Sequence, residues 1–359
     1  MNVQNIDSAE LNTNNIDVED NDEYDSNERF IHNASVPRTD VESFSPNVPI
    51  FTRDLLLASS RKAESYGYPT KTEYFGYVGQ ILGRGPCEIL KKADCDESQL
   101  ENEGYHETEA LIKDLKESKR GWERSHAQRH LVEILRQKLD PAKYMRVKKI
   151  VCFGLGNMRT ARGEDDTCYR DMHANQMQHL VACTIANTLS AMYAMHDANT
   201  MEIEGGNNTD KIEILSQDPA YDAVEKKVLS SFSPPIQVLD DPHGFLSVDE
   251  HTLTMPVFCS QPTEEIIADL LPNGPAAMLT NVDLLDPQLG SHVEEDRVDS
   301  MSVYDRRTPK VVNMYNGFEE TYLSHSLGQR PNWEREEKHD RNTGLTWLWR
   351  MKLYGKKLQ

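Results

Sequence analysis

A pair of glycines marks the first place in this sequence where ligand chemistry could occur. Gly154 and Gly156 follow the apolar run Ile150 to Phe153, a spacing typical of the start of a dinucleotide or adenosylmethionine loop. In such loops the glycines let the backbone approach the ligand, and the next helix directs its N-terminus at the phosphate. Arg159 stands where the third glycine belongs, and a polar connection to about Asn175 precedes the next helix. The pair therefore predicts either a ligand-binding turn or a tight turn that binds nothing.

Acidic residues and one histidine follow two further β-rich runs. Asp218 ends the second run, and Asp240, Asp241 and His243 end the third. An acidic residue at such a strand end accepts hydrogen bonds from ribose hydroxyls, and carboxylates with an imidazole could support acid/base chemistry or metal binding. The structural alternative is that these residues cap strands and form turns. The predicted ligand edge consists of Gly154, Gly156, Asn157, Asp218, Asp240 and His243.

Other kinds of chemistry find less support in the sequence. It holds no Gly-x-Ser-x-Gly elbow and no phosphate-binding P-loop, which disfavours serine hydrolases and nucleoside triphosphatases. Cys168, His173, His179 and Cys183 match no zinc-binding spacing, and Cys183 falls on an apolar helix face. We therefore predict no metal site and assign neither a catalytic residue nor a cofactor.

Strands that alternate with helices must position the ligand edge. Strands are predicted at 149–153, 212–215, 236–239, 253–258, 276–281 and 311–315, and helices at 180–191, 221–229 and 264–271. Thr263 is the expected cap of the last helix. This alternation predicts an α/β fold with a doubly wound, mostly parallel sheet. Right-handed crossovers would bring all the parallel strand ends to one edge.

The last part of the chain has a different period. Leu345, Trp347, Trp349, Met351 and Leu353 alternate with mostly polar residues. A period of two predicts a half-buried strand, which we place antiparallel at the edge of the sheet. The alternative is an exposed amphipathic helix with a basic end.

Four segments follow from these patterns. Residues 1–48 form a predicted disordered acidic tail, residues 49–145 a mostly helical region, residues 146–325 the sheet domain and residues 326–359 the C-terminal segment. The tail is either a surface for protein partners or a solvated leader. Within the helical region, a short helix is predicted from the cap Thr52 to Glu64. A long, basic helical stretch is predicted from Glu107 to Leu139, with a break near Gly121. The residues from His196 to Lys211 have the composition of an inserted loop.

Composition narrows the choice of partners and setting. The formal net charge of −20 disfavours general binding to nucleic acid, and the basic stretch is expected to be a solvated helix face. Neither a secretory leader nor an apolar run long enough for a membrane span is found. The six cysteines include no Cys-x-x-Cys pair. We expect an intracellular protein with reduced thiols, located in the cytoplasm or also in the nucleus.

Several motifs together resemble the sensitivity-to-red-light-reduced (SRR-like) family over roughly Phe51 to Leu323. The motifs are Ile150 to Asn157, Trp122-Glu123-Arg124-Ser125, Gln178-His179-Leu180 and Gln217-Asp218-Pro219. Asp241 to Leu246, Pro275 to Met278 and Tyr304-Asp305 with Phe318 to Tyr322 are similar to its fungal branch. The chain departs from the family pattern at Met255 to Cys259, which lacks a histidine, in the insertion and beyond Gln329.

The resemblance implies a Rossmann-like fold, an intracellular setting and a regulatory role. Members of the family are linked to circadian and red-light signalling, to haem biosynthesis and to cell division, and the resemblance implies no defined reaction. The alternative is an adenosylmethionine- or nicotinamide-dependent enzyme that uses the crevice at the strand ends. An open crevice that reaches Gly154, Asp218 and Asp240 would favour the enzyme, and a crevice filled by side chains would disfavour it.

Overall fold

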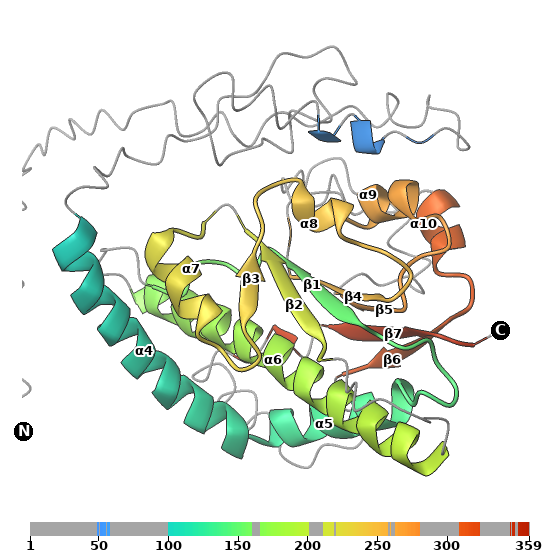
Figure 1. Ribbon diagram of the computed structural model, residues 1–359, viewed down its shortest axis with the longest axis horizontal. Helices are drawn as coiled ribbons and strands as arrows, with labels where there is room; N and C mark the ends of the chain where they lie inside the picture. The colour runs from blue at the N-terminus through green and yellow to red at the C-terminus, as the bar shows by residue number, and fades with distance from the viewer. Residues whose placement is uncertain are drawn as a thin grey trace, which may run out of the picture.

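The computed structural model describes residues 49, 51–54, 56–57, 100–159, 166–200, 211–218, 220–257, 259, 263–280, 309–323, 345, 347–348 and 351–358. These residues form a mixed α/β fold around one seven-stranded sheet (Figure 1). The predicted acidic tail lies outside the described residues.

The sheet is mostly parallel, as predicted. Its strand order is β3-β2-β1-β4-β5-β7-β6, and the first five strands in this order run parallel. The strands are β1 Lys149–Phe153, β2 Glu213–Gln217, β3 Ile236–Val238, β4 Thr252–Pro256, β5 Ala277–Thr280, β6 Phe318–Tyr322 and β7 Lys352–Lys356. Strand β1 therefore has the predicted bounds, and β2 to β5 lie within a few residues of theirs.

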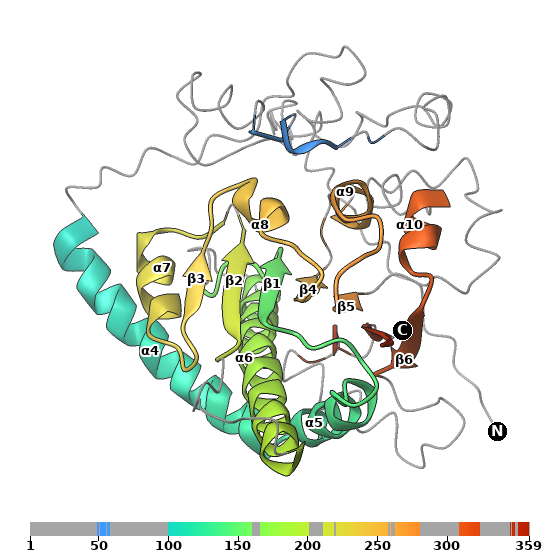
Figure 2. The same cartoon turned by 45° about the vertical axis from the view of Figure 1, so that its right-hand side comes forward.

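Helices cover both faces of the sheet (Figures 1 and 2). On one face lie α4 Leu100–Arg124, α5 His126–Lys138, α6 Asp166–Thr200 and α7 Ala223–Ser230. On the other lie α8 His243–Leu246, α9 Thr263–Leu270 and α10 Pro309–Met314. The apolar run of β1 serves both layers, because Ile150 and Cys152 pack into the first core and Val151 and Phe153 into the second.

The long helical stretch breaks at Ser125, not near Gly121 as the sequence predicted. Gly121 lies inside α4, whereas Ser125 adopts an extended backbone and its hydroxyl accepts the N–H of Gln128 at 3.0 Å. Serine is among the best N-cap residues because its side chain replaces a missing helical acceptor. Capping chemistry therefore ends one helix and starts the next, and glycine has no part in the break.

Helix α6 is longer at both ends than predicted. It starts at Asp166, inside the expected polar connection, and it ends at Thr200, inside the expected inserted loop. Near its C-terminal end Asp197 pairs with Arg146, which also lies over the ring of Tyr193. These contacts with the chain just before β1 stabilise helical turns that composition alone assigned to a loop.

The C-terminal part of the sheet corrects two predictions. Residues 311–315, predicted as a strand, belong largely to α10. The predicted strand from Leu345 onward begins only at Lys352, because Trp347 and Leu348 form a turn. Strand β7 is antiparallel as expected, but it lies between β5 and β6, so that β6 forms the edge. Four of the five β7 residues are buried, so alternation does not mark this strand.

Membrane insertion by a helix is not supported by the described part of the chain. None of its helices combines the length and the apolar composition that a bilayer span requires.

Candidate functional site

The ends of β1 and β2 meet as the sequence predicted. These two strands are parallel neighbours, with Phe153 beside Gln217, so the residues that follow each strand share one edge. The N–H of Gly156 donates to Asp218 Oδ2 at 2.6 Å, and the N–H of Gly154 donates to the carbonyl oxygen of Gln217 at 3.3 Å. Two residues of the predicted ligand edge are therefore bonded to each other.

Both glycines of the turn are required by their surroundings inside the protein. Gly154 and Gly156 have φ angles of 69° and 72°, in the left-handed region that glycine tolerates. A Cβ on Gly156 would lie 2.4 Å from Asn175 Nδ2, and one on Gly154 would lie 2.8 Å from Cys259 Sγ. The space that a nucleotide would need next to these glycines is filled by side chains from α6 and from the segment after β4.

The backbone N–H groups of the turn are already bonded to side chains. Besides the Gly156 bond to Asp218, the N–H of Met158 donates to Glu225 Oε1 at 2.7 Å. The N–H of Arg159 donates to Asn157 Oδ1 at 2.6 Å. A phosphate-binding loop presents its backbone N–H groups to the ligand. Here three such groups are directed at oxygens of the protein itself.

Side chains of α6 complete the enclosure of the turn. Asn175 Nδ2 donates to the carbonyl oxygen of Asn157 at 2.8 Å, and Gln176 Nε2 donates to that of Met158 at 3.1 Å. Gln176 also accepts from the hydroxyl of Ser118 on α4 at 2.6 Å. The predicted site residue Asn157 thus bonds within the turn through its side chain and to α6 through its carbonyl.

The N-terminus of α7 provides the second support of the turn. Asp222 is the N-cap and accepts the N–H of Glu225 at 3.0 Å, while Glu225 Oε2 accepts the N–H of Asp222 at 3.2 Å. Asp222 also pairs with the guanidinium of Arg159. The spacing Asp-x-x-Glu is a capping-box signature that the sequence analysis overlooked. It could have identified both residues as parts of a helix start.

Asp218 is partly buried by this arrangement. Burial raises the pKa of its carboxyl group, and the hydrogen bonds from the N–H groups of Ala220 and Gly156 act in the opposite direction. The Ala220 bond, to Oδ1, is 2.8 Å long. Because each carboxylate oxygen accepts a backbone N–H, Asp218 has the bonding of a turn former more than that of a ribose acceptor.

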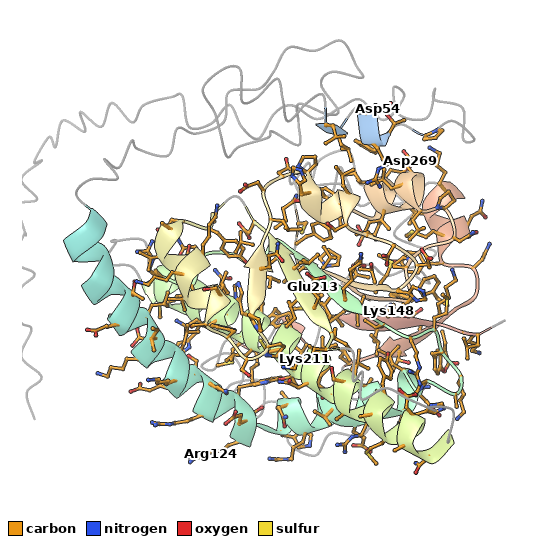
Figure 3. The ribbon with its side chains drawn as sticks, viewed as in Figure 1. Asp54, Arg124, Lys148, Lys211, Glu213 and Asp269 are labelled. Carbon is orange, nitrogen blue, oxygen red and sulfur yellow. The ribbon has the colours of Figure 1, made fainter. Side chains whose placement is uncertain are left out.

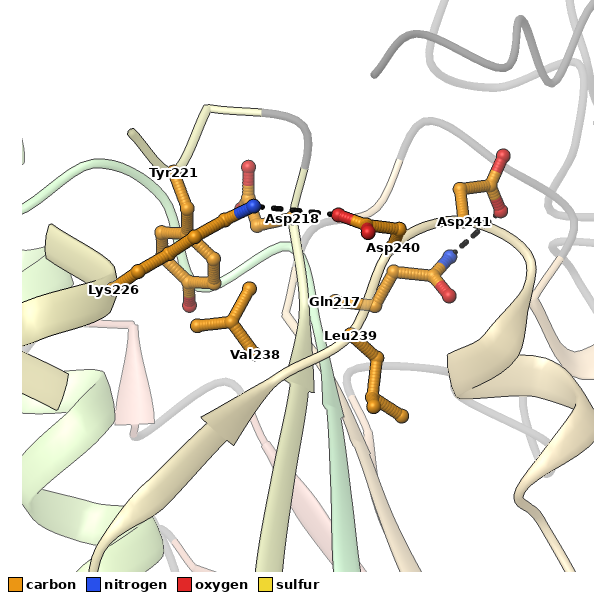
Figure 4. Close-up of a pocket in the computed structure, with 8 residues that line it drawn as sticks. All are labelled: Gln217, Asp218, Tyr221, Lys226, Val238, Leu239, Asp240 and Asp241. Carbon is orange, nitrogen blue, oxygen red and sulfur yellow. Dashed lines mark hydrogen bonds and ion pairs between the residues drawn. The ribbon is translucent and has the colours of Figure 1, made fainter. Parts of the chain in front are cut away.

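Asp240, Asp241 and His243 lie farther out on the same edge. Asp240 is exposed and pairs with Lys226 Nζ at 3.4 Å, while Asp241 Oδ1 accepts from Gln217 Nε2 at 2.9 Å (Figure 4). Exposed His243 starts α8, and its Nδ1 is 3.2 Å from the carbonyl oxygen of Asp240. Of the residues predicted for the ligand edge, Asp240 and His243 are the exposed ones.

A small hollow lies between the ends of β2 and β3 (Figure 4). Its lining consists of Gln217, Asp218, Tyr221, Lys226, Val238, Leu239, Asp240 and Asp241. The volume of about 20 Å³ is room for about one water molecule. Gly154, Gly156 and His243 are not part of the lining, so this hollow joins Asp218 to Asp240 without reaching the glycine turn.

Metal binding finds no support in the part of the chain that the structure describes. No three His, Cys, Asp or Glu side chains there are grouped so that they could hold an ion. Of the residues weighed for zinc, Cys183 donates to the carbonyl oxygen of Pro234 and His179 bonds to Tyr221. The side chain of Cys168 lies outside the described residues.

A buried polar chain beneath the turn was missed by the sequence analysis. His179 Nδ1 is 2.7 Å from the carbonyl oxygen of Asn175, and Nε2 is 2.7 Å from Tyr221 Oη, which is 2.8 Å from Ser216 Oγ. Burial lowers the pKa of His179 to about 4. A carbonyl can only accept, so Nδ1 carries the proton and the neutral ring accepts from Tyr221 at Nε2. In the sequence His179 stood out only as a rejected zinc ligand and as part of a family motif, and neither pattern names these partners.

Cys259 follows β4 and lies beside the end of the neighbouring strand β1. Its thiol donates to the carbonyl oxygen of Phe153 at 3.3 Å, beside Gly154. Burial raises the pKa of Cys259 to about 12. A thiol that stays protonated at neutral pH is a poor nucleophile, so the described surroundings of Cys259 favour packing over chemistry.

Comparison with known proteins supplies the family. No curated protein and no solved structure matches this chain. Residues 131–334 match the SRR1 domain, a span that contains β1 to β6 and more than half of the sequence. The chain therefore belongs to the SRR1 domain family.

Proposed function

We propose that this chain is a regulatory member of the SRR1 domain family that acts by binding other proteins and does not use a nucleotide or adenosylmethionine. The sheet is, in this proposal, Rossmann-like. The parallel order β3-β2-β1-β4-β5 supports this, because it is the order of dinucleotide-binding sheets. The antiparallel pair β7 and β6 is an addition to that order.

One observation carries the proposal. The N–H groups of Gly156 and Met158, which a phosphate-binding turn would present to its ligand, donate to Asp218 and Glu225. A phosphate would have to displace two carboxylates and would meet their negative charge. Asn175 and Cys259 also fill the space next to the two glycines. The turn resembles a cofactor loop in sequence and is closed by the protein in structure.

Ligand titration tests the proposal directly. Thermal unfolding of the full chain is followed with adenosylmethionine, NAD(H) and NADP(H) at about 100 times a dissociation constant of about 10 μM. Binding at that level would stabilise the protein by about 2.7 kcal/mol. That would raise the melting temperature by about 5–10 °C, and we expect a change below about 1 °C. A larger, saturable shift that Asp218→Asn abolishes would overturn the proposal.

A second experiment addresses acid/base chemistry at the exposed rim. Asp240→Asn with His243→Gln removes the two exposed ionisable groups of the predicted ligand edge, and neither side chain lies in a buried core. We expect the double variant to restore a deletion strain as fully as the wild type. Loss of function in a double variant that still folds would return the enzyme alternative to first place.

The finer assignments are part of the same proposal and rest on the sequence motifs. Asp241 to Leu246 and Pro275 to Met278 support the fungal branch. The candidate pathways are those linked to the SRR-like family, namely light signalling, haem biosynthesis and cell division. We place the protein in the cytoplasm, and also in the nucleus, in accord with these roles.

A further inference from the structure

A short N-terminal segment packs on the helix layer formed by α8, α9 and α10. This docked segment consists of residues 51–54, 56 and 57, and it includes one helical turn. Phe51 and Leu56 are 4% and 0% exposed and join the core cluster that contains Phe245 of α8, Ile267 of α9 and Val311 of α10. Figure 3 labels Asp54 on this segment close to Asp269 of α9. Two apolar side chains thus anchor the segment.

A buried carboxylate fixes the position of the docked segment. Asp269 Oδ2 accepts the backbone N–H of Phe51 at 2.9 Å, and Asp269 Oδ1 accepts Lys310 Nζ at 2.6 Å. The Asp269 side chain is 1% exposed. Arg53 Nη2 adds a 3.4 Å contact to the carbonyl oxygen of Leu246 on α8. The surface therefore contacts the backbone N–H and ring of Phe51, the guanidinium of Arg53 and the side chain of Leu56, in this order along the chain.

The docked segment is a peptide-like ligand of this surface. Its own regular structure is one turn, in which the N–H of Leu56 donates to the carbonyl oxygen of Thr52 at 3.1 Å. Residues 58–99 separate it from α4 along the chain. Among the side chains of this segment that the structure describes, Phe51 and Leu56 are the buried ones, and their burial offsets the entropy of ordering it. A segment with few buried contacts opens more easily than the sheet core.

We propose that the layer of α8, α9 and α10 is a peptide-binding surface, whose docked segment is exchanged for a segment of a partner protein with the same chemistry. The partner segment carries an aromatic residue with a free backbone N–H, a basic residue two positions later and a leucine five positions later, at the start of a helical turn. This pattern copies Phe51, Arg53 and Leu56. The inference deepens the proposed function, on which its regulatory meaning rests.

A labelled peptide of residues 49–57 tests the exchange in trans. It is titrated into the full wild-type chain and into the full chain carrying Phe51→Ala and Leu56→Ala. The wild-type docked segment competes at the high local concentration of a tethered ligand, so we expect the double variant to bind at least about tenfold tighter. Asp54→Asn, at an exposed position of the same segment, is the matched control and should bind like the wild type.

Two changes in the peptide test its recognition without touching the fold. A peptide with alanine at both anchor positions should lose binding to the double variant. N-methylation at the phenylalanine removes the donor to Asp269 and should weaken binding about tenfold or more, the usual worth of a hydrogen bond to a charged group. Equal affinities for wild type and double variant, or no binding to either, would overturn the proposal.

Hydrogen exchange on the wild type covers the case in which the double variant fails to fold. The N–H of Leu56 should exchange about 100-fold faster than those of β1, because the segment opens without global unfolding. Equal protection of the Leu56 N–H and the β1 N–H groups would contradict the proposed release of the docked segment. Concentration-dependent dimerisation that the double variant loses would make a second copy the occupant and overturn the partner assignment. None of these readouts involves a cofactor, so this proposal and the proposed function can fail separately.

Discussion

At the residue scale, Glu225 is the side chain that joins the turn after β1 to helix α7. It is 0% exposed, and its two oxygens accept the N–H groups of Met158 and Asp222. Glu225→Ala leaves both donors without these acceptors, so we expect the free energy of unfolding to fall by about 2–4 kcal/mol. Urea unfolding measures the change.

Glu225→Gln is the matched control for this prediction. Glutamine keeps the length of the side chain and one acceptor oxygen, so it should lose roughly half as much stability. A loss below about 0.5 kcal/mol for Glu225→Ala would show that the turn does not depend on this carboxylate.

His179 gives the stability of the protein a predictable pH dependence. Burial lowers its pKa from 6.5 to about 4, so the unfolded chain binds the proton first as the pH falls. The stabilisation is complete above pH 6.5 and is lost between there and about pH 4, to an extent of about 3 kcal/mol. Denaturation curves at several pH values measure this loss.

His179→Gln isolates the contribution of the imidazole. Glutamine can bond to Tyr221 and does not titrate, so the stability curve of the variant should be flatter between pH 6.5 and 4. Asp218, whose pKa is raised by burial, contributes with the opposite sign in both proteins and cancels in the comparison. Identical slopes would rule out His179 as the source.

At the element scale, two glycines allow a matched pair of substitutions. Gly121 lies within α4, and a Cβ there would meet nothing within 4 Å, whereas one on Gly355 of β7 would lie 2.8 Å from the carbonyl oxygen of Lys138. Gly121→Ala should stabilise by about 0.5–1 kcal/mol, because alanine loses less entropy in a helix. Gly355→Ala should destabilise by about 1–3 kcal/mol through overcrowding.

Thermal melts of the two variants measure both changes in stability. Opposite shifts are expected for the two substitutions. A stabilising or neutral Gly355→Ala would mean that the close approach of β7 to the end of α5 does not constrain the fold. The same contact explains why a glycine stands in the middle of a buried strand.

At the scale of the whole molecule, β7 holds the sheet together because it lies between β5 and β6. Its residues Leu353 and Tyr354 are 1% and 2% exposed, and Lys352 pairs with Glu320 of β6. A stop codon after Arg350 should therefore abolish cooperative unfolding, as followed by circular dichroism and gel filtration. Leu358→Ser, at an exposed position beyond the strand, should leave the melt unchanged. A cooperative melt of the truncated chain would make β7 dispensable.

The parallel part of the sheet and the family could be predicted from the amino-acid sequence alone. Apolar, β-branched runs end at polar residues, so β1 and its parallel neighbours were predicted close to their observed bounds. The sequence also predicted that Gly156 and Asp218 lie at one edge of the sheet, because neighbouring parallel strands end at the same edge. These features depend on local burial and on a simple topological rule, and both are visible in periodicity.

The hydrogen-bond partners of the polar groups at that edge could not be predicted from the sequence, because they depend on tertiary contacts. The N–H of Gly156 and the carboxylate of Asp218 are 62 positions apart, and they bond to each other where the sequence allowed a ligand. The insertion of β7 between β5 and β6 and the extension of α6 also depend on distant contacts. Periodicity records how much of a residue is buried, whereas the partner of a buried polar group depends on which segments the fold brings together.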